Sequence, residues 1–319
     1  MREINEKKYS VLTMQEVNDQ AVSDPEGFVG ASEEYYNNQV MAAAGAVCES
    51  GRQYKFVLLC GPSASGKTTT AHKLKHRIAA LGRTARVVSM DNFFTGIATY
   101  PILPDGSRDM ESVKAIDMDL LNECFDTLME TGRAKFPIFD FKQQKSIHEV
   151  HDITLDPEDI LIMEGIHVLN PDVLCHIERR HVYRIYCSVR TKFVDGEETI
   201  LEPKDIRLMR RIVRDYDFRN YLPEQTLAYW KNVVEGERKN IDPYRDDVER
   251  KLDNTIDYEV CVWREMLNGL MSRSGLYNNG EYPELSRIFE ALTHFEQVCH
   301  GLIPKNSLLR EFIGEDNPV

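Results

Sequence analysis

The chain lacks most features of secreted and membrane proteins. Its seven cysteines are scattered and include no C-x-x-C pair, so neither a disulfide framework nor a cysteine-based metal site is expected. No segment approaches the roughly 18 uninterrupted apolar residues of a membrane span. We therefore expect a cytoplasmic protein with reduced thiols and no membrane partner.

An excess of basic residues is also missing. The 319 residues carry 39 Lys and Arg against 52 Asp and Glu, a formal net charge of -13. A broad basic face that binds nucleic acid is therefore not expected, although a local basic pocket remains compatible with this balance. The length suffices for one large core with appendages.

Strand and helix patterns alternate regularly after about residue 50. Apolar runs predict strands at 56–60, 85–89, 159–163, 184–188 and 257–262, and periodic segments predict helices at 67–81, 117–131 and 205–216. This alternation predicts an α/β fold with a parallel sheet. Since several strands are apolar throughout, we expect helices on both faces of the sheet.

Three regions can be separated along the chain. Residues 1–50 form a polar lead-in, with a turn at 23–27 and a helix over 32–44. Residues 51–262 form the α/β core, and residues 263–319 a helical C-terminal extension packed on it. Apolar positions in this extension predict burial in the core, with a subunit contact in a homo-oligomer as the alternative: Leu285, Ile288, Phe289, Leu292 and Phe295.

The most informative segment follows the first predicted strand. It reads Gly61-Pro-Ser63-Ala64-Ser65-Gly66-Lys67-Thr68-Thr69, a G-x-x-x-x-G-K-T phosphate-binding loop. Glycines allow the backbone to curl so that its N–H groups point at phosphate oxygens, and the N-terminus of the following helix favours anions. Lys67 then places a cation on the transferred phosphate, and the Thr68 hydroxyl can ligate Mg²⁺.

Two carboxylates occur where later strands end. Asp91 follows the strand at 85–89, and Glu164 follows the strand at 159–163. Because ligands of open parallel sheets bind beyond the carboxyl ends of the strands, Lys67, Asp91 and Glu164 should share one pocket. Asp91 suits a base that accepts a hydroxyl proton, with helix capping as the alternative. Glu164 suits a magnesium ligand, with a solvated strand-end acid as the alternative.

A basic stripe lies on the predicted helix at 205–216. Arg207, Arg210, Arg211 and Arg214 follow an i, i+3, i+4, i+7 spacing that places them on one helical face. We interpret them as part of a lid, at about 191–240, that neutralises charge developing in phosphoryl transfer. Acidic residues between the arginines leave a salt-bridged surface helix as the alternative.

These segments together resemble the uridine kinase/phosphoribulokinase family of P-loop kinases. The resemblance spans about residues 52–262 and rests on five motifs in order: GPSASGKTT, SMDNFF, PIFDF, IMEGIHVLNP and RLMRRIVRDYDFRN. It implies a P-loop kinase core, Mg²⁺-dependent transfer from ATP or GTP, Asp91 as the catalytic base, and Arg211 and Arg214 on phosphates. Arg219 would then lie near the acceptor. The closing segment, residues 302–313, is similar to the end of longer bacterial nucleoside kinases.

The acceptor side departs from the family pattern. Uridine–cytidine kinases place a tyrosine, a histidine and a second basic lid residue where this chain has Phe139, Gln144 and Tyr221. We expect transfer to the 5′-hydroxyl of a pyrimidine nucleoside. The alternatives are another small-molecule acceptor, such as a sugar or sugar phosphate, and a nucleotide-binding regulatory protein without efficient catalysis.

Overall fold

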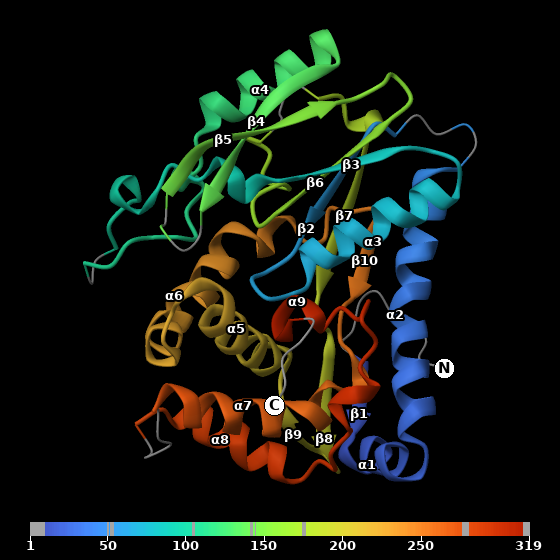
Figure 1. The fold of residues 1–319 in the computed structure, drawn as a ribbon, viewed down its shortest axis with the longest axis vertical. Helices are drawn as coiled ribbons and strands as arrows, with labels where there is room; N and C mark the ends of the chain where they lie inside the picture. Colours follow the sequence, from blue (N-terminus) through green and yellow to red (C-terminus); the bar gives the residue numbers. More distant parts are fainter. Residues whose placement is uncertain are drawn as a thin grey trace.

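The computed structural model describes residues 10–49, 51, 54–103, 106–140, 143, 145–173, 177–275 and 281–314. Its central sheet has five parallel strands in the order β10-β7-β2-β6-β3 (Figure 1). They are β2 (Phe56–Cys60), β3 (Ala85–Ser89), β6 (Ile160–Gly165), β7 (Val182–Ser188) and β10 (Arg250–Asp253). The first four confirm the predicted parallel α/β fold at the predicted places.

Helices cover both faces of this sheet, as its apolar strands require. One hydrophobic cluster joins α2 (Pro25–Val47) and α3 (Lys67–Ala80) to one face, and a second joins α4 (Met118–Thr131) to the other. A β-hairpin, β4 (Arg133–Asp140) and β5 (Lys145–Thr154), lies beside α4. The hairpin carries Phe139 toward the carboxyl ends of the strands.

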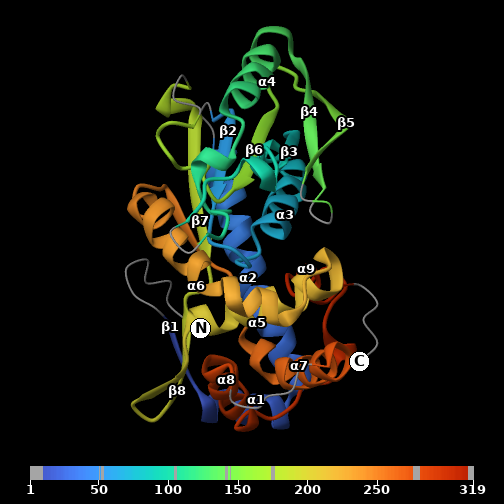
Figure 2. The same cartoon turned by 90° about the vertical axis from the view of Figure 1, so that its left-hand side faces the viewer.

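The arginine-rich helix and the C-terminal helices form much of the lower half of the molecule (Figure 2). It contains α5 (Pro203–Arg219) and α6 (Pro223–Asn240), followed by α7 (Val260–Ser274), α8 (Pro283–Thr293) and the short α9 (Arg310–Ile313). Leu285, Ile288, Leu292 and Phe295 are buried in the main core, and Phe289 packs against it, which confirms the core prediction for this extension.

A three-stranded sheet at this end was not predicted. Strand β8 (Thr191–Asp195) pairs in parallel with β1 (Ser10–Thr13) and antiparallel with β9 (Glu198–Leu201). Helix α1 (Met14–Ser23) follows β1 and begins with a capping box between Thr13 and Glu16. Residues 10–49 therefore contribute β1 and α1 to this end of the molecule and pack α2 on the central sheet.

The strand predicted at 257–262 is wrong. The fifth strand is β10, a short polar edge strand, whereas 257–259 form a 3₁₀ turn and 260–262 begin α7. Val260, Val262 and Trp263 are at most 1% exposed, so this apolar segment is a helix buried on all sides. Its β-branched and aromatic residues favour a strand locally, and tertiary packing overrides that preference.

The turn predicted at 23–27 is also wrong. Asp24 is the N-cap of α2, because its side chain accepts a 2.9 Å hydrogen bond from Gly27 N and Pro25 occupies the first helical position. The helix predicted over 32–44 therefore begins at Pro25 and continues to Val47. No helix in the described part of the chain is long and apolar enough to cross a membrane.

Candidate active site

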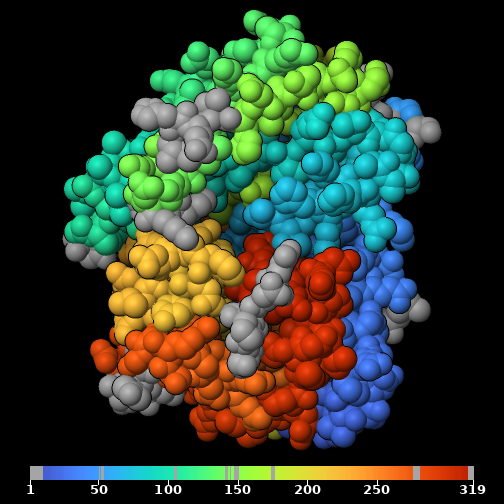
Figure 3. All heavy atoms as spheres, viewed as in Figure 1, coloured from blue at the N-terminus to red at the C-terminus, as the bar shows by residue number. Residues whose placement is uncertain are grey.

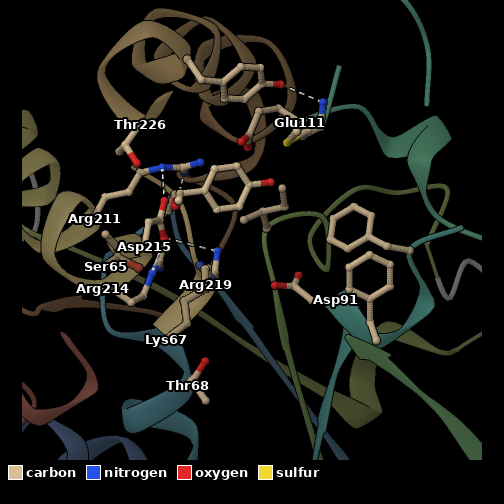
Figure 4. Close-up of a pocket in the computed structure, with 18 of the residues that line it drawn as sticks. Ser65, Lys67, Thr68, Asp91, Glu111, Arg211, Arg214, Asp215, Arg219 and Thr226 are labelled. Atoms are coloured by element: carbon tan, nitrogen blue, oxygen red, sulfur yellow. Dashed lines mark hydrogen bonds and ion pairs between the residues drawn. The ribbon is translucent and has the colours of Figure 1, made fainter. Parts of the chain in front are cut away.

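One cavity of about 360 Å³ opens at the carboxyl ends of the parallel strands, and Figure 4 shows it in close-up. Lys67, Asp91 and Glu164 all line it, which confirms that the three strand ends meet in one pocket. The other predicted residues on its wall are Ser63, Ala64, Ser65, Thr68, Phe139, Arg211, Arg214, Arg219 and Tyr221. Gly61, Gly66 and Thr69 do not line it, and Gln144 lies outside the described residues.

The glycines of the loop permit close contacts with the chain around it. A Cβ at Gly61 would lie 2.1 Å from the Cys187 carbonyl oxygen of β7, so only glycine fits there. Gly66 has a φ of +83° and precedes α3, and a Cβ there would lie 2.7 Å from Leu308. Tertiary packing as well as phosphate geometry therefore requires both glycines.

Lys67 and Thr68 begin α3 at the mouth of the cavity. The Lys67 ammonium donates a 3.0 Å hydrogen bond to the Pro62 carbonyl, which holds it against the loop. The Thr68 hydroxyl donates to Glu164 Oε1 at 3.4 Å. A hydroxyl beside a carboxylate suits Mg²⁺, which takes one or two protein oxygens and completes its shell with phosphate and water.

Glu164 occupies a buried place at the end of β6. Its side chain is only 3% exposed. Burial, and next the charge of Asp91, raise the pKa of Glu164 to about 7, against the opposing charge of Lys67. A buried carboxylate with excess negative charge around it favours a nearby cation, so the residues present fit a magnesium site.

Three arginines converge on Asp215 along one wall of the cavity (Figure 4). Arg214 donates two hydrogen bonds to Asp215 Oδ1 at 2.9 and 2.7 Å, Arg211 lies 3.2 Å from Oδ2, and Arg219 lies 3.7 Å from Oδ1. Burial alone would raise the pKa of Asp215, but the three guanidinium groups together lower it. Three positive charges against one negative charge leave this wall net positive.

The remaining two arginines of the basic stripe have another role. Arg207 makes a two-pronged ion pair with Glu237 of α6 at 2.6 and 2.8 Å, and Arg210 makes one with Glu259 at 2.8 and 2.7 Å. The prediction that all four arginines face the polyphosphate is therefore wrong for Arg207 and Arg210, which pair with carboxylates of the protein itself. Residues at i, i+3, i+4 and i+7 spread over a wide arc of a helix. On α5, one edge of this arc carries Arg207 and Arg210 and contacts α6 and the start of α7. The other edge carries Arg211 and Arg214 and faces the cavity.

Asp91 lies on the opposite side of the cavity, in the 3₁₀ turn Met90–Phe93 after β3. The neighbouring Asn92 accepts a 3.1 Å hydrogen bond from Phe139 N, which ties the β4–β5 hairpin to this turn. The ring of Phe139 packs against Phe94 with centroids 5.8 Å apart. Asp91 therefore stands beside an aromatic wall.

Glu111 is one of the cavity residues that the sequence did not indicate. It lines the cavity and is 6% exposed, and burial raises its pKa to about 7, although Arg211 acts in the opposite direction. Helix α6 supports it, since Asn240 donates to the Glu111 carbonyl at 2.7 Å and Gly236 leaves room for its side chain. Glu111 lies in an irregular loop without periodicity, so no sequence pattern indicated it.

Asn220 and Tyr221 complete the cavity wall after α5. Asn220 adopts a left-handed conformation with φ of 59° and ends the helix. The Tyr221 N–H then donates to the Asp215 carbonyl at 3.0 Å, which turns the chain back toward the cavity. Burial and the neighbouring Arg214 lower the pKa of Arg219 to about 10.

Known proteins share this sequence pattern. A uridine kinase from Ureaplasma urealyticum is 28% identical over 56% of this chain and 77% of its own length. A uridine kinase from Lactobacillus helveticus is 29% identical over 55% of this chain and 74% of its own. The solved structure of a possible uridine kinase from Bacillus stearothermophilus aligns at 15% identity and a TM-score of 0.46, over 68% of this chain and 98% of that one.

The family model for the phosphoribulokinase/uridine kinase family matches residues 56–254, which include the whole parallel sheet and most of the cavity wall. The chain is thus a P-loop small-molecule kinase that belongs to the phosphoribulokinase/uridine kinase family.

Proposed function

We propose that the protein transfers the γ-phosphoryl group of ATP or GTP to the 5′-hydroxyl of a pyrimidine nucleoside, such as uridine or cytidine, in a Mg²⁺-dependent reaction. The observation that carries this proposal is the division of one cavity into a basic side and an acidic aromatic side. Lys67, Arg211 and Arg214 line the first, and Asp91 lies on the second. Glu111 lies at the border, where Arg211 is the charged group that lowers its pKa most.

The basic side suits the triphosphate. Backbone N–H groups at the start of α3 have no intrahelical acceptors and favour anions. We assign Gly61, Ser63, Ala64, Ser65, Gly66, Lys67, Thr68 and Thr69 to nucleotide binding. Thr68 and Glu164 would hold Mg²⁺, which would neutralise negative charge on the triphosphate.

Asp91 is assigned the role of general base. Its carboxylate accepts the proton of the acceptor hydroxyl as the hydroxyl oxygen forms a bond to the γ-phosphorus. The bond from the γ-phosphorus to the β–γ bridging oxygen breaks, and the nucleoside diphosphate leaves with that electron pair. Arg211 and Arg214, which form ion pairs with Asp215 beside the cavity, stabilise the charge on the transferred group.

The acidic side suits a hydroxylated acceptor with a flat apolar part. Aromatic side chains on this side can stack on a base, and the Glu111 carboxylate can accept hydrogen bonds from sugar hydroxyls. The aromatic residues that line the cavity are Phe94, Tyr100, Phe139, Tyr221 and Tyr229. We also propose Arg219 as an acceptor contact, because it lies beside Asp215 at the border of the two sides.

A sugar or sugar phosphate is the second candidate acceptor. Phe139 has no polar group that would recognise a base edge, and because it is 5% exposed and packs on Phe94 it offers little ring surface for stacking. The excess positive charge around Asp215 would also accommodate a phosphate on the acceptor. Both candidates use the same basic side and the same base.

The test is a phosphoryl-transfer screen with purified protein, Mg²⁺ and ATP or GTP. Nucleosides, sugars, sugar phosphates and other hydroxylated metabolites are offered singly, and release of ADP or GDP is measured. Turnover with uridine or cytidine supports the pyrimidine nucleoside acceptor, whereas turnover only with a non-nucleoside moves the acceptor to the second candidate. Binding of nucleotide without turnover on any acceptor would contradict the proposal.

We also propose a division of the chain into three regions. We assign residues 51–262 to the kinase core with a lid at about 191–240, residues 1–50 to a lead-in, and residues 263–319 to an extension on the core. The six described cysteines are free thiols, which suits the proposed cytoplasmic setting.

A further inference from the structure

The C-terminal segment reaches the phosphate loop. Helix α9 lies against α5 and beneath the start of α3 in Figure 1, and the red segment that contains α9 adjoins α3 in the space-filling view of Figure 3. Glu311 of α9 lines the same cavity as Lys67 and Asp91. A segment some 240 residues away in sequence therefore forms part of the site.

The contact between this segment and the loop is a hydrogen bond to a phosphate-binding amide. Thr69 N donates to Glu311 Oε2 at 3.0 Å. Thr69 lies in the first turn of α3, where backbone N–H groups have no intrahelical acceptor and bind the phosphates of a nucleotide in P-loop proteins. A carboxylate at this amide has the charge and the acceptor oxygens of a phosphate group.

The rest of the segment holds Glu311 in this place. Leu308 lies on the loop backbone, because its Cδ1 is 2.7 Å from the position of a Cβ on Gly66. The Phe312 ring faces the guanidinium of Arg210 at 5.0 Å, and both Leu308 and Phe312 are fully buried. Glu311 itself is only half-buried, so its side chain can turn away while its neighbours stay packed.

We propose that Glu311 is a built-in competitor of the nucleotide. Its carboxylate occupies the Thr69 amide in the nucleotide-free protein and must leave when the triphosphate binds. The inference rests on the proposed function only in assigning the loop to nucleotide binding. Displacing this carboxylate opposes binding, so its removal should tighten ATP binding.

Isothermal titration calorimetry with ATP and Mg²⁺ tests the proposal. Glu311→Gln removes the charge and leaves only a neutral amide oxygen, which is a weaker acceptor for the Thr69 N–H, so it should lower the Kd about tenfold, or about 1.4 kcal/mol. Glu311→Asp retains the charge but is one carbon shorter and cannot hold the amide, so it should also lower the Kd, by less. Glu290→Gln, an exposed carboxylate on α8, provides the matched control with the same change of net charge and should leave the Kd unchanged.

Each other outcome contradicts the proposal in a recognisable way. An unchanged or higher Kd for Glu311→Gln would show that Glu311 does not compete with ATP. A lower Kd for Glu311→Gln with a wild-type Kd for Glu311→Asp would reduce the effect to repulsion through space and overturn competition at the amide. Absence of ATP binding by wild type and all variants, with thermal melts that show folded protein, would instead overturn the nucleotide site itself.

Discussion

At the scale of single residues, the cavity is organised by where each carboxylate lies. Asp215 is neutralised by three arginines, Glu164 is buried beside Thr68, and Asp91 stands on the far side next to the aromatic wall. Only a carboxylate without a strong cationic partner can take a proton from a hydroxyl while phosphate charge is handled elsewhere. This separation supports our proposal that Asp91 is the base.

Replacement of Asp91 by asparagine tests its role. The amide keeps the shape of the side chain but cannot accept a proton, so turnover should fall at least about 10²-fold while nucleotide affinity stays nearly constant. Steady-state kinetics and ATP titration of the same preparation measure the two quantities. Turnover at the wild-type level would remove Asp91 from the mechanism.

Glu111 should make stability depend on pH. Its pKa is raised from 4.5 to about 7, mainly by burial, so the folded state binds a proton that the unfolded state has lost between these values. Stability from this group is complete below about pH 4.5 and is lost as pH rises toward 7. Glu111→Gln should therefore be more stable than wild type at pH 8, by on the order of 1–3 kcal/mol, with little difference at pH 4.5.

Urea unfolding of wild type and Glu111→Gln at both pH values checks this expectation. Asp119→Asn, an exchange on α4 of a carboxyl that does not line the cavity, serves as the control. A stability difference between wild type and Glu111→Gln that is the same at both pH values would show that the carboxyl does not titrate as described.

At the scale of elements, α5 combines structural and functional arginines on one helix. Arg207 and Arg210 fasten it to Glu237 and Glu259, and Arg211 and Arg214 extend to the cavity. The spacing alone predicted one basic face, because it contains no information about which neighbours surround the helix. Helix α5 is therefore anchored by half of the stripe that was expected to bind phosphate.

Two substitutions on α5 should separate these roles. Arg210→Met leaves Glu259 buried without its cation and should lower the free energy of unfolding by about 3–5 kcal/mol. Arg214→Ala leaves Asp215 paired with Arg211 and Arg219. It should therefore lower kcat strongly, with much smaller changes in the free energy of unfolding and in the Kd for ATP. Thermal unfolding and kinetics on both variants would contradict the division if Arg214→Ala were the more destabilising.

At the scale of the whole molecule, the C-terminal extension and the α/β core share one hydrophobic cluster. Phe193 of β8 and Phe295 after α8 meet edge to face, with ring centroids 5.9 Å apart and planes at 85°. The extension is therefore part of the cooperative core and presents α9 to the phosphate loop. Loss of its packing should affect the entire domain.

Phe295→Ala tests this integration. Removal of a buried aromatic ring should lower the free energy of unfolding by about 3–5 kcal/mol in a single transition. Phe218→Ala, where the ring is 43% exposed, should change it by less than about 1 kcal/mol. A small effect of Phe295→Ala in urea unfolding, or an early separate transition, would mean that the extension is only loosely attached.

Local patterns determined the parts of this protein whose chemistry is local. Apolar strands, the phosphate loop and the carboxylates after β3 and at the end of β6 could all be predicted, because a buried strand and the site at its end are adjacent in the chain. The order of the motifs likewise determined the family. Phe139 and Tyr221 were placed on the cavity wall by the same resemblance.

Only the tertiary structure decided features that depend on distant partners. It made 257–262 a helical segment, divided the arginines between two roles, and brought Glu111 and Glu311 to the cavity. Burial and electrostatic partners are supplied by segments up to 240 residues away, such as Glu311 at Thr69, and no local periodicity records them. The sequence therefore determined the phosphate-binding loop and the residue types around it. Packing decided which charged side chains pair within the fold and which line the cavity.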